Sequence, residues 1–350
     1  MKTIKIKFVG FYSDFNYKIS HIYKILVKHY NVIVCDDADY IICSVFGKRY
    51  EYCKHPQVRI MFEGENYIPD FNLIDYGICN YPLSFGDRCF YFPFFIDEFG
   101  HFENITKKDR NYPDDILKEK PYFANFIAGH ESEYNIRGDF FKKLCKYKRV
   151  ESPGTYLNNM PAGQTVAWDD DTKRAFQNKC KFTLCFESTK HEGFITEKLT
   201  DAFYADTIPV YYGSSHVTEI FNPKAFINCS DYESFDAVIE KIKELDNDNE
   251  KYLDMLREPI FVNPKFYETK MADFEKFLYN IFDQPIENAY RRSRVYSPKS
   301  FDDFLKNAIS PERLTFKKLF AAFFKKCSIL IRYYFNIVKN KILKIRLCKK

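Results

Sequence analysis

The stretch CFESTKHEGFITEKLTDAFYADTIPVYYG, residues 185–213, decides the fold. The apolar run KFTLCFES leads into a polar loop, an amphipathic segment and a second apolar run, TIPVYYG. This order predicts a buried strand, a helix and a second, parallel strand. We expect Thr196 to be the N-cap of the helix and Glu197 to lie in its first turn, where the helix dipole favours an anion.

The same alternation of strands and helices extends over most of the chain. Residues 107–121, KKDRNYPDDILKEKP, are charged, contain two prolines and predict an interdomain linker. We therefore expect an α/β protein of two Rossmann-like domains, residues 1–118 and 119–300, that bind ligands at strand carboxyl ends in the cleft between them. The other apolar runs that predict strands are IKIKFVGF, VIVC, DYIICSVFG, QVRIMF, YFANFIAG and AFINCSD.

Composition narrows the class of protein. The 350 residues are 46% hydrophobic, which is typical of a globular protein and allows two domains. Eleven cysteines are scattered without a CxxC pair, so a zinc ribbon is not indicated. The N-terminus MKTIKIKFVGF does not resemble a signal peptide, and we expect a reduced, cytoplasmic protein.

The positive charge is concentrated at the C-terminus. Residues 313–350 contain twelve Lys or Arg and no Asp or Glu, so the remainder carries a net charge of −7 against +5 for the chain. This asymmetry argues against a nucleic-acid-binding body. Lysine pairs alternate with aromatic and aliphatic clusters, and no apolar run is long enough to cross a bilayer. We expect residues 301–350 to form an amphipathic tail on an anionic membrane surface, with packing on the body as the alternative.

Lys198 gives the first indication of chemistry. A cation in the first turn of a helix opposes the dipole, but it becomes favourable if a phosphate binds at the same helix end. Glu197 could then accept hydrogen bonds from a ribose diol. No P-loop or GxGxxG motif is present, so a sugar nucleotide fits better than ATP or a dinucleotide. A capped strand–helix–strand unit without any ligand explains the same pattern.

Three blocks of the sequence together resemble one family. FTLCFESTKHEGFITEKLTDAFYADTIPVYYGS (182–214) is similar to the donor-binding signature of the α-1,3/4-fucosyltransferases, glycosyltransferase family 10. FEGENYIPDFNLIDYGIC (62–79) resembles the acceptor-side motif of bacterial members, and residues 122–159 resemble the block between them. The resemblance implies a GT-B fold and transfer of L-fucose from GDP-fucose, with inversion, to a hydroxyl of N-acetylglucosamine.

The resemblance also implies roles for individual residues. Glu65 matches the catalytic base, and Glu63, two residues earlier, is its rival because both would face the same way if the strand continued. Arg137 matches the arginine near the GDP phosphates. Lys198 would supply a second positive charge and Glu197 the ribose contact. With these cations the chemistry requires no metal or other cofactor.

Two positions depart from the family pattern, and two acidic motifs invite a metal. Ser188 stands where many bacterial members have Asn, and Phe194 where they have Tyr, so we expect weaker binding of GDP-fucose than in a Tyr-bearing relative. Asp169–Asp171 and the pair Asp37 and Asp39 each form a DxD pattern. We interpret both as caps or turns, since DDDTKRAF is typical of a helix start.

The leading interpretation is an inverting α-1,3-fucosyltransferase. It would add fucose to the N-acetylglucosamine of an N-acetyllactosamine-type surface glycan from the inner face of the cytoplasmic membrane. A GT-B transferase that uses another nucleotide sugar is the nearest alternative. A membrane-surface binding protein without catalysis is a further alternative, which the tail and Phe194 leave open.

Overall fold

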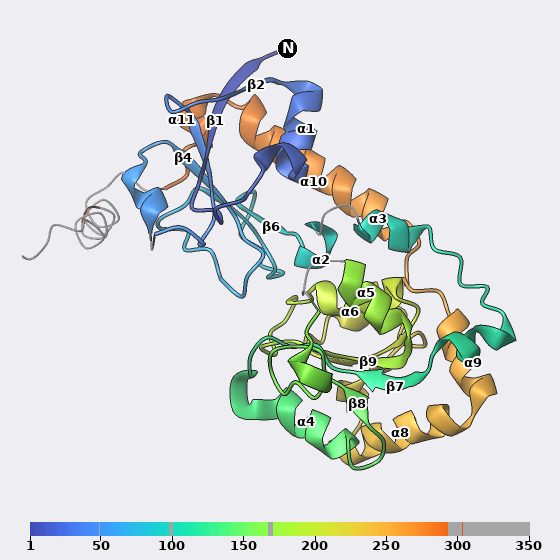
Figure 1. The fold of residues 1–350 in the computed structure, drawn as a ribbon. Coiled ribbons are helices and arrows are strands. Elements are labelled where there is room, and N and C mark those ends of the chain that lie inside the picture. Colours follow the sequence, from blue (N-terminus) through green and yellow to red (C-terminus); the bar gives the residue numbers. More distant parts are fainter. Residues whose placement is uncertain (49, 98–100, 167–170, 293–302, 304–350) are drawn as a thin grey trace, which may run out of the picture. The chain divides into compact units, whose positions relative to one another are not determined.

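Figure 1 shows the computed structural model of the chain. It describes residues 1–48, 50–97, 101–166, 171–292 and 303. The chain divides into two compact units, Met1–Ser300 and Phe301–Lys350. The tail predicted for residues 301–350 thus lies outside the described residues, apart from Asp303. Within the described ranges, no helix combines the length and apolar character that a membrane crossing requires.

The first sheet contains six parallel strands in the order β2-β1-β3-β4-β5-β6. β-branched and aromatic residues fill these strands, as expected for a parallel sheet buried on both faces. The strand order reverses between β1 and β3, and such a switch point is where open α/β sheets bind ligands. The strands are β1 (Thr3–Val9), β2 (Asn31–Val34), β3 (Tyr40–Cys43), β4 (Val58–Phe62), β5 (Tyr76–Cys79) and β6 (Cys89–Tyr91).

The second sheet contains five parallel strands in the order β11-β10-β9-β7-β8. Its switch point lies between β7 and β9, so the segments that follow these two strands meet at one edge. Two parallel sheets confirm the predicted α/β architecture. The strands are β7 (Tyr122–Asn125), β8 (Val150–Glu151), β9 (Cys180–Phe186), β10 (Ile208–Tyr212) and β11 (Ile227–Asn228).

Helices cover both faces of the second sheet (Figure 1). Apolar residues of α4, α8 and α9 share a buried cluster with β7 and β9, while α5 and α6 contact β9. Helix α5 begins at Asp171, as DDDTKRAF predicts. The helices up to α9 are α1 (His21–His29), α2 (Phe94–Asp97), α3 (His101–Thr106), α4 (Ile136–Leu144), α5 (Asp171–Asn178), α6 (Glu197–Tyr204), α7 (Val217–Ile220), α8 (Phe235–Asn247) and α9 (Asn249–Arg257).

The last two helices, α10 (Phe266–Asp283) and α11 (Ile286–Ala289), return to the first sheet. The apolar strip of α10 belongs to the same buried cluster as α1 and strands β1 and β3–β5. Lys2 Nζ donates to the carbonyl of Phe282 at 2.6 Å, and Tyr30 Oη donates to Asp283 Oδ1 at 2.7 Å. The division of the sequence at residues 119–300 did not anticipate this crossing, because an amphipathic helix does not reveal which sheet it covers.

Short 3-10 helices complete the description. One of them, Asp114–Glu119, lies within the charged stretch that the sequence predicts to be a linker. The remaining ones are Tyr17–Ile19, Glu51–Lys54, Glu133–Asn135, Pro161–Gly163 and Cys229–Asp231.

Candidate functional site

Arg137 lies in the first turn of α4, beyond β7 and beside the switch point of the second sheet. The residue is 2% exposed, and its Nη2 donates to the carbonyl of His130 and lies 3.0 Å from the Nδ1 of that residue. Among the described residues, Nε has no hydrogen-bond partner. Burial lowers the pKa of Arg137, and the charges of Glu131 and Glu187 oppose this shift. A buried guanidinium with an unused donor is suited to bind an anion.

Glu187 directly follows β9 and joins this strand to the start of α6. Its carboxylate accepts hydrogen bonds from the backbone N–H and the hydroxyl of Thr196, both at 2.8 Å. Lys198 Nζ lies 3.2 Å from Glu187 Oε2 and 3.3 Å from Glu197 Oε1, and it donates to Thr196 Oγ1 at 2.8 Å. One lysine therefore lies between two buried carboxylates at the N-terminus of α6.

The charged groups of this cluster determine one another's protonation states. Burial alone raises the pKa of Glu197, but Lys198 and Lys173 outweigh burial and lower that pKa to about 2. Burial likewise lowers the pKa of Lys198, yet Glu187 and Glu197 raise it above its ordinary value. For Glu187 burial prevails, and its pKa is raised. Lys198 is consequently a cation, and Glu197 an anion, at neutral pH.

Thr196 occupies the N-cap position of α6, but its side chain does not cap the helix. The hydroxyl donates to Glu187 instead, because that buried carboxylate needs every donor within reach. Thr196 is thus the N-cap residue, as the sequence predicts, although its hydroxyl does not accept a hydrogen bond from the helix. The preceding turn depends on Gly193, whose φ is +78° and where a Cβ would lie 2.5 Å from the carbonyl oxygen of Asn80.

Ser188 and Phe194 lie in the same segment but differ in exposure. Ser188 is half-buried and directly follows Glu187. Phe194 is only 4% exposed, so its ring packs inside the protein. The structure thus brings Arg137, Ser188, Glu197 and Lys198 to the carboxyl edge of β7 and β9, and any contact of Ser188 or Phe194 with a donor stays a prediction.

The loop after β4 separates the two candidate bases of the first sheet. β4 ends at Phe62, so Glu63 and Glu65 do not share a face of a continued strand as the sequence allowed. Glu63 is 2% exposed, whereas Glu65 is exposed. Glu63 accepts hydrogen bonds from Ser44 Oγ and the N–H of Val45, both at 3.1 Å, and from the N–H of Glu65 at 2.9 Å. Burial raises the pKa of Glu63 to about 7, against the effect of these hydrogen bonds.

Further hydrogen bonds hold the rest of this loop. The buried side chain of Asn80 donates to the carbonyl of Gly64. Tyr81 Oη donates to the side-chain oxygen of Asn66, whose nitrogen donates to Thr189 Oγ1 at 2.8 Å. Asn66 therefore connects the loop after β4 with the loop after β9. These contacts fix the backbone around Glu65.

The DxD patterns form ordinary surface contacts where the structure describes them. Asp171 accepts a hydrogen bond from Arg174 at 3.2 Å in the first turn of α5, whereas Asp169 and Asp170 lie outside the described residues. Asp37 pairs with Lys5 at 3.1 Å. In the part of the chain that is described, no three His, Cys, Asp or Glu side chains lie close enough together to hold a metal.

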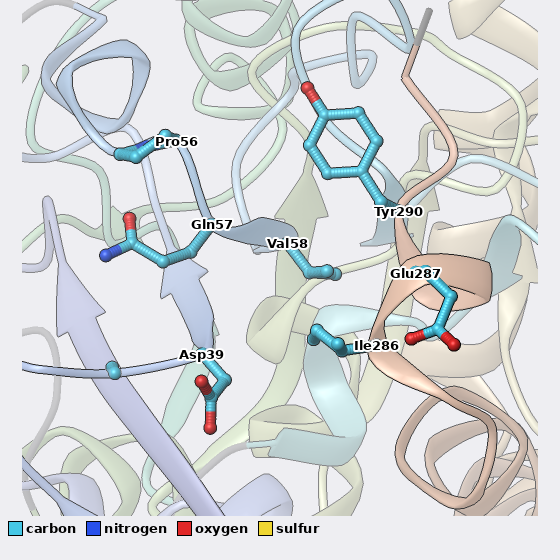
Figure 2. A pocket seen from close by; sticks show the side chains of 8 residues that line it. Asp39, Pro56, Gln57, Val58, Ile286, Glu287 and Tyr290 are labelled. Atoms are coloured by element: carbon cyan, nitrogen blue, oxygen red, sulfur yellow. The ribbon is translucent and has the colours of Figure 1, made fainter. Parts of the chain in front are cut away.

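A surface pocket with a volume of about 510 Å³ lies away from these residues. Figure 2 shows Asp39, the residue before β3, and Val58, the first residue of β4, opposite Ile286, Glu287 and Tyr290. Because parallel strands begin at this edge and end at the other, the pocket lies at the edge opposite to Glu63. It contains none of the predicted catalytic or donor-binding residues.

Two parts of the site escaped the sequence reasoning. Glu187 stands inside the decisive stretch, and a carboxylate directly after a buried strand was the available signal. The second part is a buried ion-pair cluster between α5 and α6. Arg174 Nε donates to Asp201 Oδ1 at 2.8 Å, and Lys173 pairs with the other oxygen of Asp201. No periodicity connects residues so far apart in the sequence.

Two models of one family match the chain. Residues 117–271 match the C-terminal domain of glycosyltransferase family 10 (fucosyltransferase), and residues 6–97 match the N-terminal domain of the α-(1,3)-fucosyltransferase FucT. The chain belongs to glycosyltransferase family 10, the fucosyltransferases.

Individual relatives agree with this assignment. The chain is 32% identical over 302 residues to the α-(1,3)-fucosyltransferase FucT of Helicobacter pylori, a match that covers 75% of this chain and 61% of that protein. A crystal structure of an α1,3-fucosyltransferase superposes with a TM-score of 0.68 at 26% identity, covering 84% of this chain and 93% of that one. The crystal structure of an α1,3-fucosyltransferase with GDP-fucose gives a TM-score of 0.65 at 28% identity, covering 83% and 93%. The fold is GT-B, with two Rossmann-like sheets.

Proposed function

We propose that this protein transfers L-fucose from GDP-fucose to a glycan as an α-1,3-fucosyltransferase. Family membership and the similarity to a fucosyltransferase with GDP-fucose support the donor. The observation that carries the proposal is the cluster at the carboxyl edge of β7 and β9. There a lysine at the N-terminus of α6 pairs with an ionised glutamate, and a buried arginine with an unused donor follows the neighbouring strand.

The donor would bind with its diphosphate near the two cations. A phosphate oxygen that reaches the buried Nε of Arg137 would accept a hydrogen bond from it, while Nη2 keeps its bond to His130. Lys198 adds a positive charge at the N-terminus of α6, where the helix dipole also favours an anion. Glu197 stays ionised at neutral pH and would accept hydrogen bonds from the ribose. These groups would stabilise the departing diphosphate, so we propose that no divalent metal is required.

Glu65 would remove the proton from the acceptor hydroxyl in an inverting reaction. Its carboxylate is exposed at the end of a first-sheet strand, on a loop fixed by Glu63. Glu63 has three hydrogen bonds to the protein and is buried, so it supports the loop in preference to acting as the base. Inversion needs this one base together with stabilisation of the leaving group.

The acceptor and the location in the cell complete the proposal. We propose that the acceptor hydroxyl belongs to the N-acetylglucosamine of an N-acetyllactosamine-type surface glycan. The basic tail would hold the enzyme on the inner face of the cytoplasmic membrane by its attraction to anionic lipid. Flotation with anionic liposomes tests the tail, because the full chain should float and a chain that ends at Pro311 should not. Equal flotation of the two chains would contradict membrane attachment.

A donor panel tests the activity itself. Purified protein is incubated with N-acetyllactosamine and with GDP-fucose, GDP-mannose or UDP-galactose, each with and without EDTA, and products are identified by mass spectrometry. We expect a fucosylated product from GDP-fucose alone, and the same yield with EDTA. If a product formed only from another donor, that donor's sugar would replace fucose in the proposed activity. The absence of any product or donor hydrolysis would favour a binding protein without catalysis.

A further inference from the structure

Two exposed aromatic rings lie at the switch point of the first sheet. Tyr12 follows β1 and is 41% exposed, and Phe46 follows β3 and is 48% exposed. Their rings meet edge to face, with centroids 5.8 Å apart and an interplanar angle of 82°. The carboxyl edge of adjacent strands where the order reverses is a preferred ligand-binding position, and in the second sheet the same position holds Arg137 and Lys198.

Further aromatic rings support this pair from below. The ring centroids of Tyr12 and Phe15 are 5.6 Å apart, and Phe15 stacks on Phe11 with centroids 4.0 Å apart. Phe8, the penultimate residue of β1, contacts both Phe11 and Phe15. A continuous set of rings thus runs from the strand to the exposed pair, and it limits the movement of Tyr12.

The two loops that carry the exposed rings are joined through their backbones. The N–H of Gly47 donates to the carbonyl of Gly10 at 2.8 Å, and the N–H of Ser44 donates to the carbonyl of Val9 at 3.0 Å. The φ of Gly10 is +77°, and a Cβ there would lie 2.5 Å from the carbonyl oxygen of Ser44. The pair of rings is therefore displayed on a fixed backbone.

One carboxylate connects these loops with the loop of the proposed base. Val45, the residue before Phe46, donates its N–H to Glu63 Oε2, and Glu63 Oε1 accepts the N–H of Glu65. The exposed rings and Glu65 consequently belong to neighbouring loops at one edge of the same sheet. A molecule that offers a hydroxyl to Glu65 therefore binds at the same edge of the sheet as Tyr12 and Phe46.

We propose that Tyr12 and Phe46 bind a neutral pyranose ring of the acceptor glycan. The C–H face of a pyranose is apolar and packs on an aromatic ring, while its hydroxyls stay in water, and binding sites are commonly lined by such rings. The ring that is bound would be a neighbour of the sugar that receives fucose. The inference rests on the proposed function and adds the acceptor subsite to it.

Steady-state kinetics of the full chain tests the subsite. We expect Tyr12→Ala and Phe46→Ala to raise the KM for N-acetyllactosamine on the order of three- to tenfold, as the loss of an aromatic contact suggests. The KM for GDP-fucose and the rate of GDP-fucose hydrolysis should not change, and Phe46→Tyr should restore the acceptor KM. Phe85→Ala is the matched control, because Phe85 is similarly exposed, at 46%, but lies at the opposite edge of the sheet. Its ring packs against Arg88, whose Nε donates to the carbonyl of Asp75, the residue before β5. An unchanged acceptor KM in both variants, or an equal rise in the control, overturns the proposal.

A binding measurement separates this proposal from the proposed activity. Saturation-transfer difference NMR with N-acetyllactosamine reports contact between aromatic protons and sugar protons without any transfer. Signals on the sugar with the wild type and Phe85→Ala, lost with Tyr12→Ala and Phe46→Ala, support the subsite even if no fucose is transferred. Signals that persist in both variants, or that are absent from the wild type, overturn it.

Discussion

Replacement of Lys198 by methionine tests how the cluster at α6 is stabilised. The change leaves Glu187 and Glu197 buried without the ammonium that lies 3.2 and 3.3 Å from their oxygens. The pKa of Glu197 is about 2 instead of its ordinary 4.5, which corresponds to ~3 kcal/mol of stabilisation at neutral pH. Removing one partner of a buried ion pair costs about 3–5 kcal/mol. We expect the unfolding free energy at pH 7 to fall by about that amount.

The pH dependence of this loss has a definite sign. In the wild type, the pKa of Glu197 is lowered by folding, so its contribution is complete above pH 4.5 and disappears as the pH falls toward about 2. In the variant, burial raises the pKa of both carboxyls, so their ionisation destabilises the fold as the pH rises. The difference between wild type and variant is therefore largest near neutral pH and shrinks in acid.

Urea unfolding followed by circular dichroism at pH 7 and pH 4, without nucleotide, measures this difference. Lys224→Met, at an exposed lysine, is the matched control and should unfold like the wild type. The double variant Lys198→Met with Glu187→Gln should recover part of the loss, because one uncompensated charge is gone. A Lys198→Met protein as stable as the control at pH 7, or a larger loss at pH 4 than at pH 7, would refute the reasoning.

Three other changes address the donor and the base loop. Arg137→Met should weaken GDP binding in calorimetry about ten- to a hundredfold, because it removes a charged hydrogen bond. The unfolding free energy should not fall, because burial disfavours the charge of Arg137 and its Nε has no hydrogen-bond partner among the described residues. Unchanged affinity would contradict the assignment. In the wild type, the transfer rate should decline below about pH 7, because protonated Glu63 can no longer accept all three hydrogen bonds. Glu63→Gln should transfer fucose more slowly than the wild type and should not show this decline. A decline below pH 7 that persists in the variant would contradict this prediction. Folding raises the pKa of Glu63, so the unfolding free energy of the wild type should fall by ~3 kcal/mol as the pH rises from 4.5 to 7. The Glu63→Gln variant should not show this fall. Phe194→Tyr should lower the KM for GDP-fucose, and an unchanged KM would count against the donor-contact prediction.

Local patterns in the sequence were sufficient to predict most of the fold. Short β-branched runs and one amphipathic helix after another predicted both parallel sheets, because strand and helix periods are properties of neighbouring residues. Helix α10 shows the limit of such patterns, since its sequence indicates an apolar face but not which sheet this face covers.

The site was predictable residue by residue but not as a network. The resemblance located Arg137, Glu197 and Lys198, and the structure brings them to one edge of the second sheet. The hydroxyl of Thr196 donates to buried Glu187 instead of capping the helix, because a buried carboxylate with fewer hydrogen bonds costs more than an uncapped helix end. β4 ends at Phe62, as the run QVRIMF predicts, but the sequence did not show that Glu63 is buried by hydrogen bonds to Ser44, Val45 and Glu65.

The rate of fucose transfer by Glu65→Gln tests the central claim most directly. The variant should bind GDP like the wild type but transfer fucose about a hundredfold more slowly or worse, because the amide cannot accept the proton of the acceptor hydroxyl. Wild-type transfer by this variant would contradict the proposal that Glu65 is the base.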